Sequence, residues 1–162
     1  MTARDSGLPG SDRPVETNIT AARWLIKLHH FTAETKCKDW ATHALRYVTI
    51  PRIARSMGLK GGLLSADFEL RTEPLHLVVI GERDNETSQA LFRAAQATPF
   101  EHRCIHWFSN RTAAESLLKL NLAESNESAG YIFHDGQASE PIQADHDFGD
   151  AINLHLRKTD AK

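Results

Sequence analysis

The chain has 162 residues, of which 41% are hydrophobic and 25% charged, a composition typical of one ordinary globular domain with a core. Its formal net charge is −2, from 19 basic and 21 acidic residues, which excludes a strong field for nucleic acid or an anionic membrane. No segment approaches the roughly 20 apolar residues that cross a bilayer, and the N-terminus lacks the apolar core of a signal peptide. We therefore expect a cytoplasmic protein, or a piece of one, with neither nucleic acid nor membrane as a partner.

The N-terminal third of the sequence predicts a leader followed by helices. Residues 1–17 are rich in Gly, Pro, Ser, Asp and Arg without apolar periodicity, so we expect a disordered leader. Apolar residues then recur at helical spacing, with Asn18 or Thr20 as the N-cap. A short turn separates this helix from a second one that Pro51 kinks or restarts, which predicts an antiparallel helix pair over residues 18–57.

The middle of the chain predicts a helix and then a βαβ unit. Residues 63–70 follow a glycine-rich break and fit either a helix or a strand, of which we favour the helix. Residues 75–80 are an unbroken apolar run that stops at Gly81, as expected for a strand covered on both faces. A helix over about residues 85–97 leads to a second strand at residues 103–108, parallel to the first if the crossover is right-handed.

The last part of the chain predicts a β-hairpin and a helix. Residues 131–134 read as a strand, and the Asp135-Gly136 pair is the strongest hairpin signal in the sequence. The returning strand is expected at residues 138–143, where Pro141 confines it to a sheet edge. An amphipathic helix closes the chain.

These elements predict a single α/β domain over residues 18–158. Its α/β unit, residues 75–158, has a small mixed sheet of three to four strands, made of the βαβ unit and the hairpin and flanked by helices. The helix pair of residues 18–57 precedes it.

One candidate metal site lies on the second predicted strand. His102, Cys104 and His106 alternate there and point to one face, a geometry that could hold zinc or copper if a fourth ligand converged. The simpler interpretation is that Cys104 packs as a small apolar residue and the histidines lie near the strand ends. We expect the simpler interpretation and predict no resident cofactor.

The loop after Gly81 is a second candidate site because open α/β sheets bind ligands at the carboxyl ends of their strands. It has one glycine where a dinucleotide motif needs three, and Asp84 is better interpreted as a helix N-cap. No catalytic residue is predicted. Trp24, Trp40 and Trp107 are expected to pack in the core rather than to form a stacking platform.

Four stretches of the chain follow the pattern of one protein family: NITAARWL at residues 18–25, GLLSA at 62–66, LVVIG at 77–81, and GYIF at 130–133 with Pro141 beyond it. Together they make residues 18–156 resemble the C-terminal region of thioredoxin-domain-containing proteins of uncertain function, the family of spermatogenesis-associated protein 20 and its bacterial relatives. The resemblance implies that the helix pair corresponds to the last hairpin of a barrel of helical hairpins. It also implies that the chain is a fragment or a truncated relative.

The resemblance implies no redox chemistry for this chain. Phe133 and Ala138 stand where the family usually has two cysteines, and the thioredoxin Cys-x-x-Cys is absent. The resemblance therefore implies a non-catalytic accessory or interaction domain of a larger thioredoxin-domain-containing protein. Its expected partner is the remainder of a longer polypeptide or a second copy. The alternative is a small-molecule or metal-binding enzyme domain that uses the strand face around Cys104 or the loop after Gly81.

Overall fold

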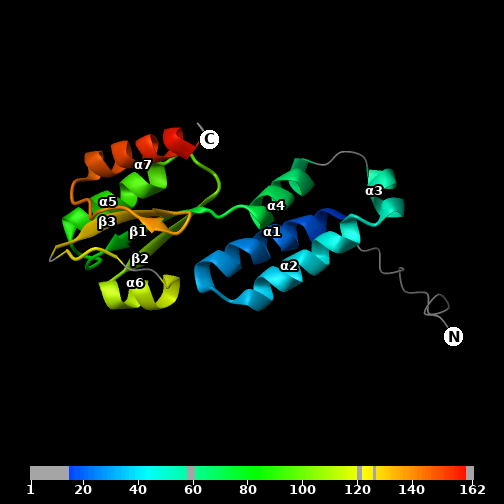
Figure 1. Cartoon of the computed structure of the whole chain (residues 1–162), viewed down its shortest axis with the longest axis horizontal. Helices are drawn as coiled ribbons and strands as arrows, with labels where there is room; N and C mark the ends of the chain where they lie inside the picture. The colour runs from blue at the N-terminus through cyan, green and yellow to red at the C-terminus, as the bar shows by residue number, and fades with distance from the viewer. Residues whose placement is uncertain (1–14, 58–60, 120–121, 126, 160–162) are drawn as a thin grey trace. The chain divides into compact units, whose positions relative to one another are not determined.

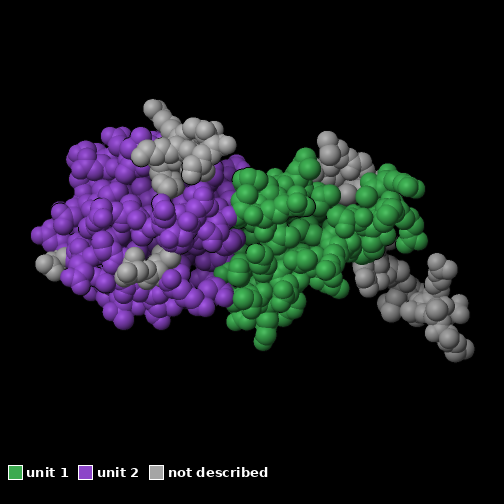
Figure 2. Space-filling model, in the orientation of Figure 1, with its two compact units in different colours: residues 1–29, 34–72 green, residues 30–33, 73–162 purple. Residues whose placement is uncertain are grey.

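The computed structural model describes residues 15–57, 61–119, 122–125 and 127–159. It divides into two compact units, residues 1–29 with 34–72, and residues 30–33 with 73–162 (Figure 2). Residues 1–14 of the expected leader lie outside the described residues, whereas residues 15–17 belong to the first helix.

The first unit is helical. Its elements are α1 (Val15–Thr32), α2 (Thr35–Val48), α3 (Pro51–Met57) and α4 (Gly61–Arg71), with the last residues of α1 grouped with the second unit (Figure 1). The helix pair α1 and α2 and the helix at α4 confirm the predicted elements, and Pro51 starts a new helix as its fixed φ allows. The predicted caps Asn18 and Thr20 are wrong, because α1 already begins at Val15.

The core of this unit forms where three helices meet. It contains seven buried side chains: Ile19, Ala22, Ile26, Ala41, Leu45, Val48 and Ala66. At its edge, the guanidinium of Arg23 on α1 donates two hydrogen bonds from Nε and one from Nη2 to the carboxylate of Glu69 on α4. Glu69 is only 6% exposed, so this pair fixes α4 against α1.

The second unit contains the sheet. Its elements are β1 (Leu75–Ile80), α5 (Glu86–Ala97), β2 (Arg103–Phe108), α6 (Arg111–Leu118), β3 (Ala129–His134), β4 (Gln137–Ala138) and α7 (Asp145–Thr159). The strand order is β2-β1-β3-β4. β1 pairs parallel with β2 and antiparallel with β3, and β3 pairs antiparallel with β4. The predicted α/β class, a four-stranded mixed sheet flanked by helices, is therefore confirmed.

The sheet is covered on both faces, which accounts for the unbroken apolar sequence of β1. Helices α5 and α7 lie on one face and α6 on the other (Figure 1). Leu75, Leu77 and Val79 pack toward α5 and α7, whereas Val78 and Ile80 belong to the cluster around α6. All six residues of β1 are buried.

The hairpin forms as the sequence predicts, but its second strand is shorter. Asp135 and Gly136 both have positive φ, 49° and 78°, as a tight turn of this kind requires. β4 spans two residues rather than residues 138–143, and beyond it a single bridge joins Gly130 to Ile142. The bridge is shifted by one residue from the register of Phe133 with Ala138, so an extra residue on the β4 side interrupts the ladder.

Candidate functional site

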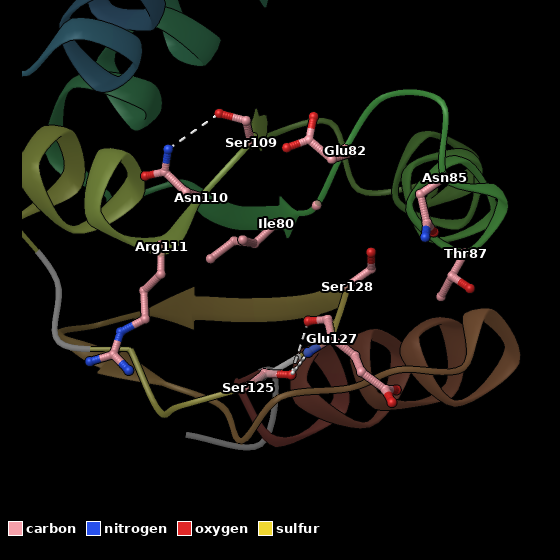
Figure 3. A pocket seen from close by; sticks show the side chains of 11 residues that line it. Ile80, Glu82, Asn85, Thr87, Ser109, Asn110, Arg111, Ser125, Glu127 and Ser128 are labelled. Carbon is pink, nitrogen blue, oxygen red and sulfur yellow. Dashed lines mark hydrogen bonds between the residues drawn. The ribbon is translucent and has the colours of Figure 1, made fainter.

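A polar pocket lies at the carboxyl ends of β1 and β2. After β1 the chain turns to α5 on one face of the sheet, and after β2 it turns to α6 on the other. Such a divergence leaves a crevice at the point where the connections part, the usual ligand position in open α/β sheets. The pocket measures about 570 Å³ and is lined by Ile80, Gly81, Glu82, Asn85, Thr87, Ser109, Asn110, Arg111, Ser125, Glu127 and Ser128 (Figure 3).

Two helix N-termini open at this pocket, each capped by an asparagine. The side-chain oxygen of Asn85 accepts a hydrogen bond from the Ser88 N–H at 3.1 Å, and that of Asn110 accepts one from the Ala113 N–H at 2.9 Å. The cap of α5 is thus Asn85, and the predicted cap Asp84 is wrong by one residue. Asn and Asp are about equally good caps, so sequence alone could not choose between the two neighbours.

Gly81 allows the chain to pass closely between α5 and the segment before β3. It has φ +149°, and a Cβ there would lie 2.2 Å from the Ser88 hydroxyl and 2.4 Å from that of Ser128. Its carbonyl accepts a hydrogen bond from Trp107 Nε1 at 2.9 Å. The pocket floor is therefore held by contacts that only glycine permits.

The lining of the pocket is mostly polar. In Figure 3, Ser109 and Asn110 lie above Ile80, and Ser125 and Glu127 lie below it. Hydroxyl and amide groups predominate among the lining residues that the structure describes, and these include no histidine, cysteine or lysine. Hydroxyl nucleophiles need an adjacent base, most often an imidazole or amine. The one arginine, Arg111, is already paired with Glu115 at 2.7 Å.

The second candidate site is a buried cluster on the α6 side of the sheet. The ligand-type atoms of His76, Cys104 and His106 all lie within 4.8 Å of one another, and each residue is less than 9% exposed. The parallel register sets His76 beside Cys104 and Val78 beside His106. The three side chains therefore share one face, as the period of two along each strand requires.

The structure changes the composition of the predicted metal site. Cys104 and His106 lie together as expected, but His76 of β1 completes the group and His102 is outside it. His102 precedes β2, where its carbonyl accepts a hydrogen bond from the Leu75 N–H at 3.0 Å. Sequence reasoning missed His76 because the residue stands inside an apolar run. The predicted parallel pairing of the two strands was the signal that could have identified His76 as a neighbour of Cys104.

The two histidines of the cluster are hydrogen bonded to each other. His76 Nδ1 lies 3.0 Å from His106 Nε2, and the rings stack with centroids 5.2 Å apart. Burial, with smaller repulsive contributions from His106, His30, His102 and His134, lowers the pKa of His76 from 6.5 to about 3. Burial also lowers the pKa of His106 to about 4. Both imidazoles are therefore neutral at pH 7.

The tryptophans of the helical unit are not in its core. Trp24 is 62% exposed and Trp40 58%, so the predicted core packing is wrong for both. The core side of α1 is occupied by Ile19, Ala22 and Ile26, and Trp24 is on the opposite side of the helix. Trp107 is partly buried, with its ring 4.7 Å from that of Phe92.

A second helix of this unit also carries apolar side chains away from the core. Leu64 and Phe68, one turn apart on α4, are 57% and 51% exposed. Ala66, two residues from each, is fully buried in the shared core. Both α1 and α4 therefore have apolar side chains on the side that faces the core and on the opposite side. This pattern is typical of helices that pack against other protein segments on both sides. We call Trp24, Leu64 and Phe68 the outward apolar residues.

None of the described helices combines the length and the apolar character required to span a membrane. Comparison of the chain with protein-family models, with curated proteins and with solved structures finds no match. Function is therefore inferred from the two sites and the outward apolar residues.

Proposed function

We propose that the chain is a non-catalytic interaction domain that binds another polypeptide through the outward apolar residues of α1 and α4. The observation that carries the proposal is the exposure of Trp24, Leu64 and Phe68, each more than half accessible although large and apolar. Single exposed apolar residues are ordinary, but large aromatic side chains on helices that already contribute to a core are a feature of interfaces.

The energetics favour a partner for these side chains. Burying a fully exposed large apolar side chain contributes about 1.5–3 kcal/mol. The outward apolar residues are each a little over half exposed, so the three together contribute on the order of 4 kcal/mol before the entropic cost of association. Arg23 and Glu69 hold α1 to α4, so both helices are already ordered before a partner binds and little ordering cost is added.

The partner that we propose is the rest of a longer thioredoxin-domain-containing polypeptide, or a second copy when that is absent. The resemblance in sequence supports the first, because it equates α1 and α2 with a hairpin that packs against neighbouring hairpins. We also infer a cytoplasmic location. Cys37 and Cys104, the two cysteines of the chain, are buried thiols outside any disulfide, as a reducing compartment favours.

Binding of an apolar fluorescent dye tests whether the outward apolar residues form an accessible surface. The chain is compared with a Leu64→Glu/Phe68→Glu variant and with Leu154→Glu, which changes a residue of α7 that is 56% exposed. We expect the double variant to lose most of the dye fluorescence and the control to keep it. A chain that binds no dye, or a double variant that binds as much as the control, contradicts the proposal.

The polar pocket favours a second candidate, binding of a small polar molecule by the loop after Gly81. Its hydroxyl and amide lining and its place at the divergence of the two connections support this function. A panel of sugars, nucleosides and amino acids, screened by ligand-observed NMR, tests it. A true ligand loses affinity in Thr87→Val/Ser109→Ala and keeps it in Thr42→Val, whose hydroxyl bonds only within α2. The absence of any binder contradicts this candidate.

A further inference from the structure

We propose that His76, Cys104 and His106 form a binding site for one zinc ion. This inference does not depend on the interaction proposed above. The site is also distinct from the polar pocket: His76 is the second residue of β1, and the pocket lies beyond its last residue, Ile80. At about 3.3 Å per residue, four residues separate the two by about 13 Å along the strand.

The distances suit a single ion. A tetrahedral zinc site has Zn–N bonds of about 2.0 Å and a Zn–S bond of about 2.3 Å, which places the ligand atoms about 3.3–3.6 Å apart. In the structure His76 Nδ1 and His106 Nε2 are 3.0 Å apart, and the three ligand atoms are all within 4.8 Å. Small side-chain rotations that move the ligand atoms by a few tenths of an ångström to about one ångström therefore allow all three to bind one ion.

The backbone preorganises this arrangement. His76 and Cys104 are direct neighbours across the parallel pair β1 and β2, and His106 is two residues further on the same face. Neighbouring strands lie about 4.8 Å apart, so no loop has to order before the ion binds. The group is buried, with the rings of His30 and Phe31 packed against His76 and His106, and this burial strengthens each ligand bond.

The ligand types favour zinc over the hard cations. Two imidazole nitrogens and a thiolate are borderline-soft ligands, whereas magnesium and calcium require oxygen ligands. Three protein ligands leave the fourth tetrahedral position for water, as in zinc sites that are not closed.

Proton balance follows from the hydrogen bonds. As the Zn–S bond forms, the Cys104 thiol gives its proton to solvent, so one proton is released per ion. The hydrogen that joins His76 Nδ1 to His106 Nε2 belongs to one of the two rings. That ring takes the tautomer with the proton on its other nitrogen, so that both facing nitrogens carry lone pairs for the metal.

The test is a metal titration of the full chain prepared without a histidine tag and stripped with a chelator. We expect one equivalent of zinc to bind, in competition with a chromogenic chelator, and one proton to be released. Removal of a residue that only orients a metal ligand typically weakens metal binding 10–100-fold. Loss of a ligand itself, in Cys104→Ser or His106→Gln, is therefore expected to weaken it at least about 100-fold. His43→Gln, which changes an exposed histidine of α2, is expected to bind as the parent does.

Cobalt substitution gives a readout that does not require the Cys104 variant to fold. In Cys37→Ser, Cys104 is the only thiol of the chain, so a thiolate-to-cobalt charge-transfer band identifies Cys104 as a ligand. We expect this band in Cys37→Ser and its loss when zinc is added. The proposal is overturned if neither ion binds, if copper alone binds, or if cobalt binds without a thiolate band.

Discussion

The hydroxyl of Ser88 on α5 donates a hydrogen bond of 2.9 Å to the hydroxyl of Ser128, the residue that immediately precedes β3. The two residues are 40 positions apart and meet over Gly81, where a Cβ would fall within 2.4 Å of both oxygens. The start of α5, the end of β1 and the segment before β3 therefore meet at Gly81, which forms the floor of the polar pocket.

Gly81→Ala is expected to destabilise the sheet unit by about 2–4 kcal/mol. The cost combines the strained positive φ with the displacement of Ser88 and Ser128. Urea denaturation followed by circular dichroism measures it. Gly61→Ala is the matched control, because a Cβ at Gly61 meets nothing within 4 Å, and its effect should stay within about 0.5 kcal/mol. Equal stability of the two variants would refute this account of Gly81.

Glu69→Gln is expected to destabilise the helical unit by about 1–3 kcal/mol. The change removes the carboxylate charge from a nearly buried position and breaks its ion pair with the Arg23 guanidinium. Chemical denaturation followed by the helical circular dichroism signal measures this loss. Asp67→Asn breaks the exposed pair with Arg71 and should cost under about 0.5 kcal/mol. A larger loss in Asp67→Asn than in Glu69→Gln would contradict the assignment.

The metal-free protein is expected to lose stability as the pH falls from about 6.5 to about 4. The pKa values of His76 and His106 are lowered on folding to about 3 and about 4. In this window the unfolded chain binds more protons than the folded one, so stability is full above pH 6.5 and declines below it. The two histidines together should account for a loss on the order of 5 kcal/mol. Burial is the main cause of the lowered pKa of His76, and repulsion from His106, His30, His102 and His134 contributes to it.

Chemical denaturation at a series of pH values measures this effect. His106→Leu removes one of the two titrating histidines. It should reduce the slope of the free energy of unfolding against pH by up to the value that corresponds to one bound proton. His43→Gln, an exposed position, should leave the slope unchanged. An identical slope in His106→Leu and the parent would show that the pair does not titrate as described.

The sheet could be predicted well from the sequence because its signals are local. The apolar run of residues 75–80 and the strand at residues 103–108 were predicted with the bounds that the structure gives. The Asp135-Gly136 turn was equally clear, since few residues accept two consecutive positive φ angles. Each of these signals depends on neighbours in the sequence and on no distant contact.

The two sites were harder to predict because they depend on distant contacts. His76 joins Cys104 and His106 through strand pairing 28–30 residues away, and nothing near His76 in the sequence marks it as a ligand. Trp24 was placed in the core because large aromatic residues are usually buried, although the core of α1 is filled by smaller side chains. The loop after Gly81 was located by position, but the serines that face it come from residues 109–128.

The central claim is that α1 and α4 bind another polypeptide through the outward apolar residues. Sedimentation velocity of the parent, of Trp24→Glu/Phe68→Glu and of the Leu154→Glu control, at concentrations up to about 100 µM, tests it most directly. We predict that the parent and the control self-associate and that the double variant remains a folded monomer. A parent that stays monomeric over this range, or a double variant that associates as the parent does, would contradict the claim.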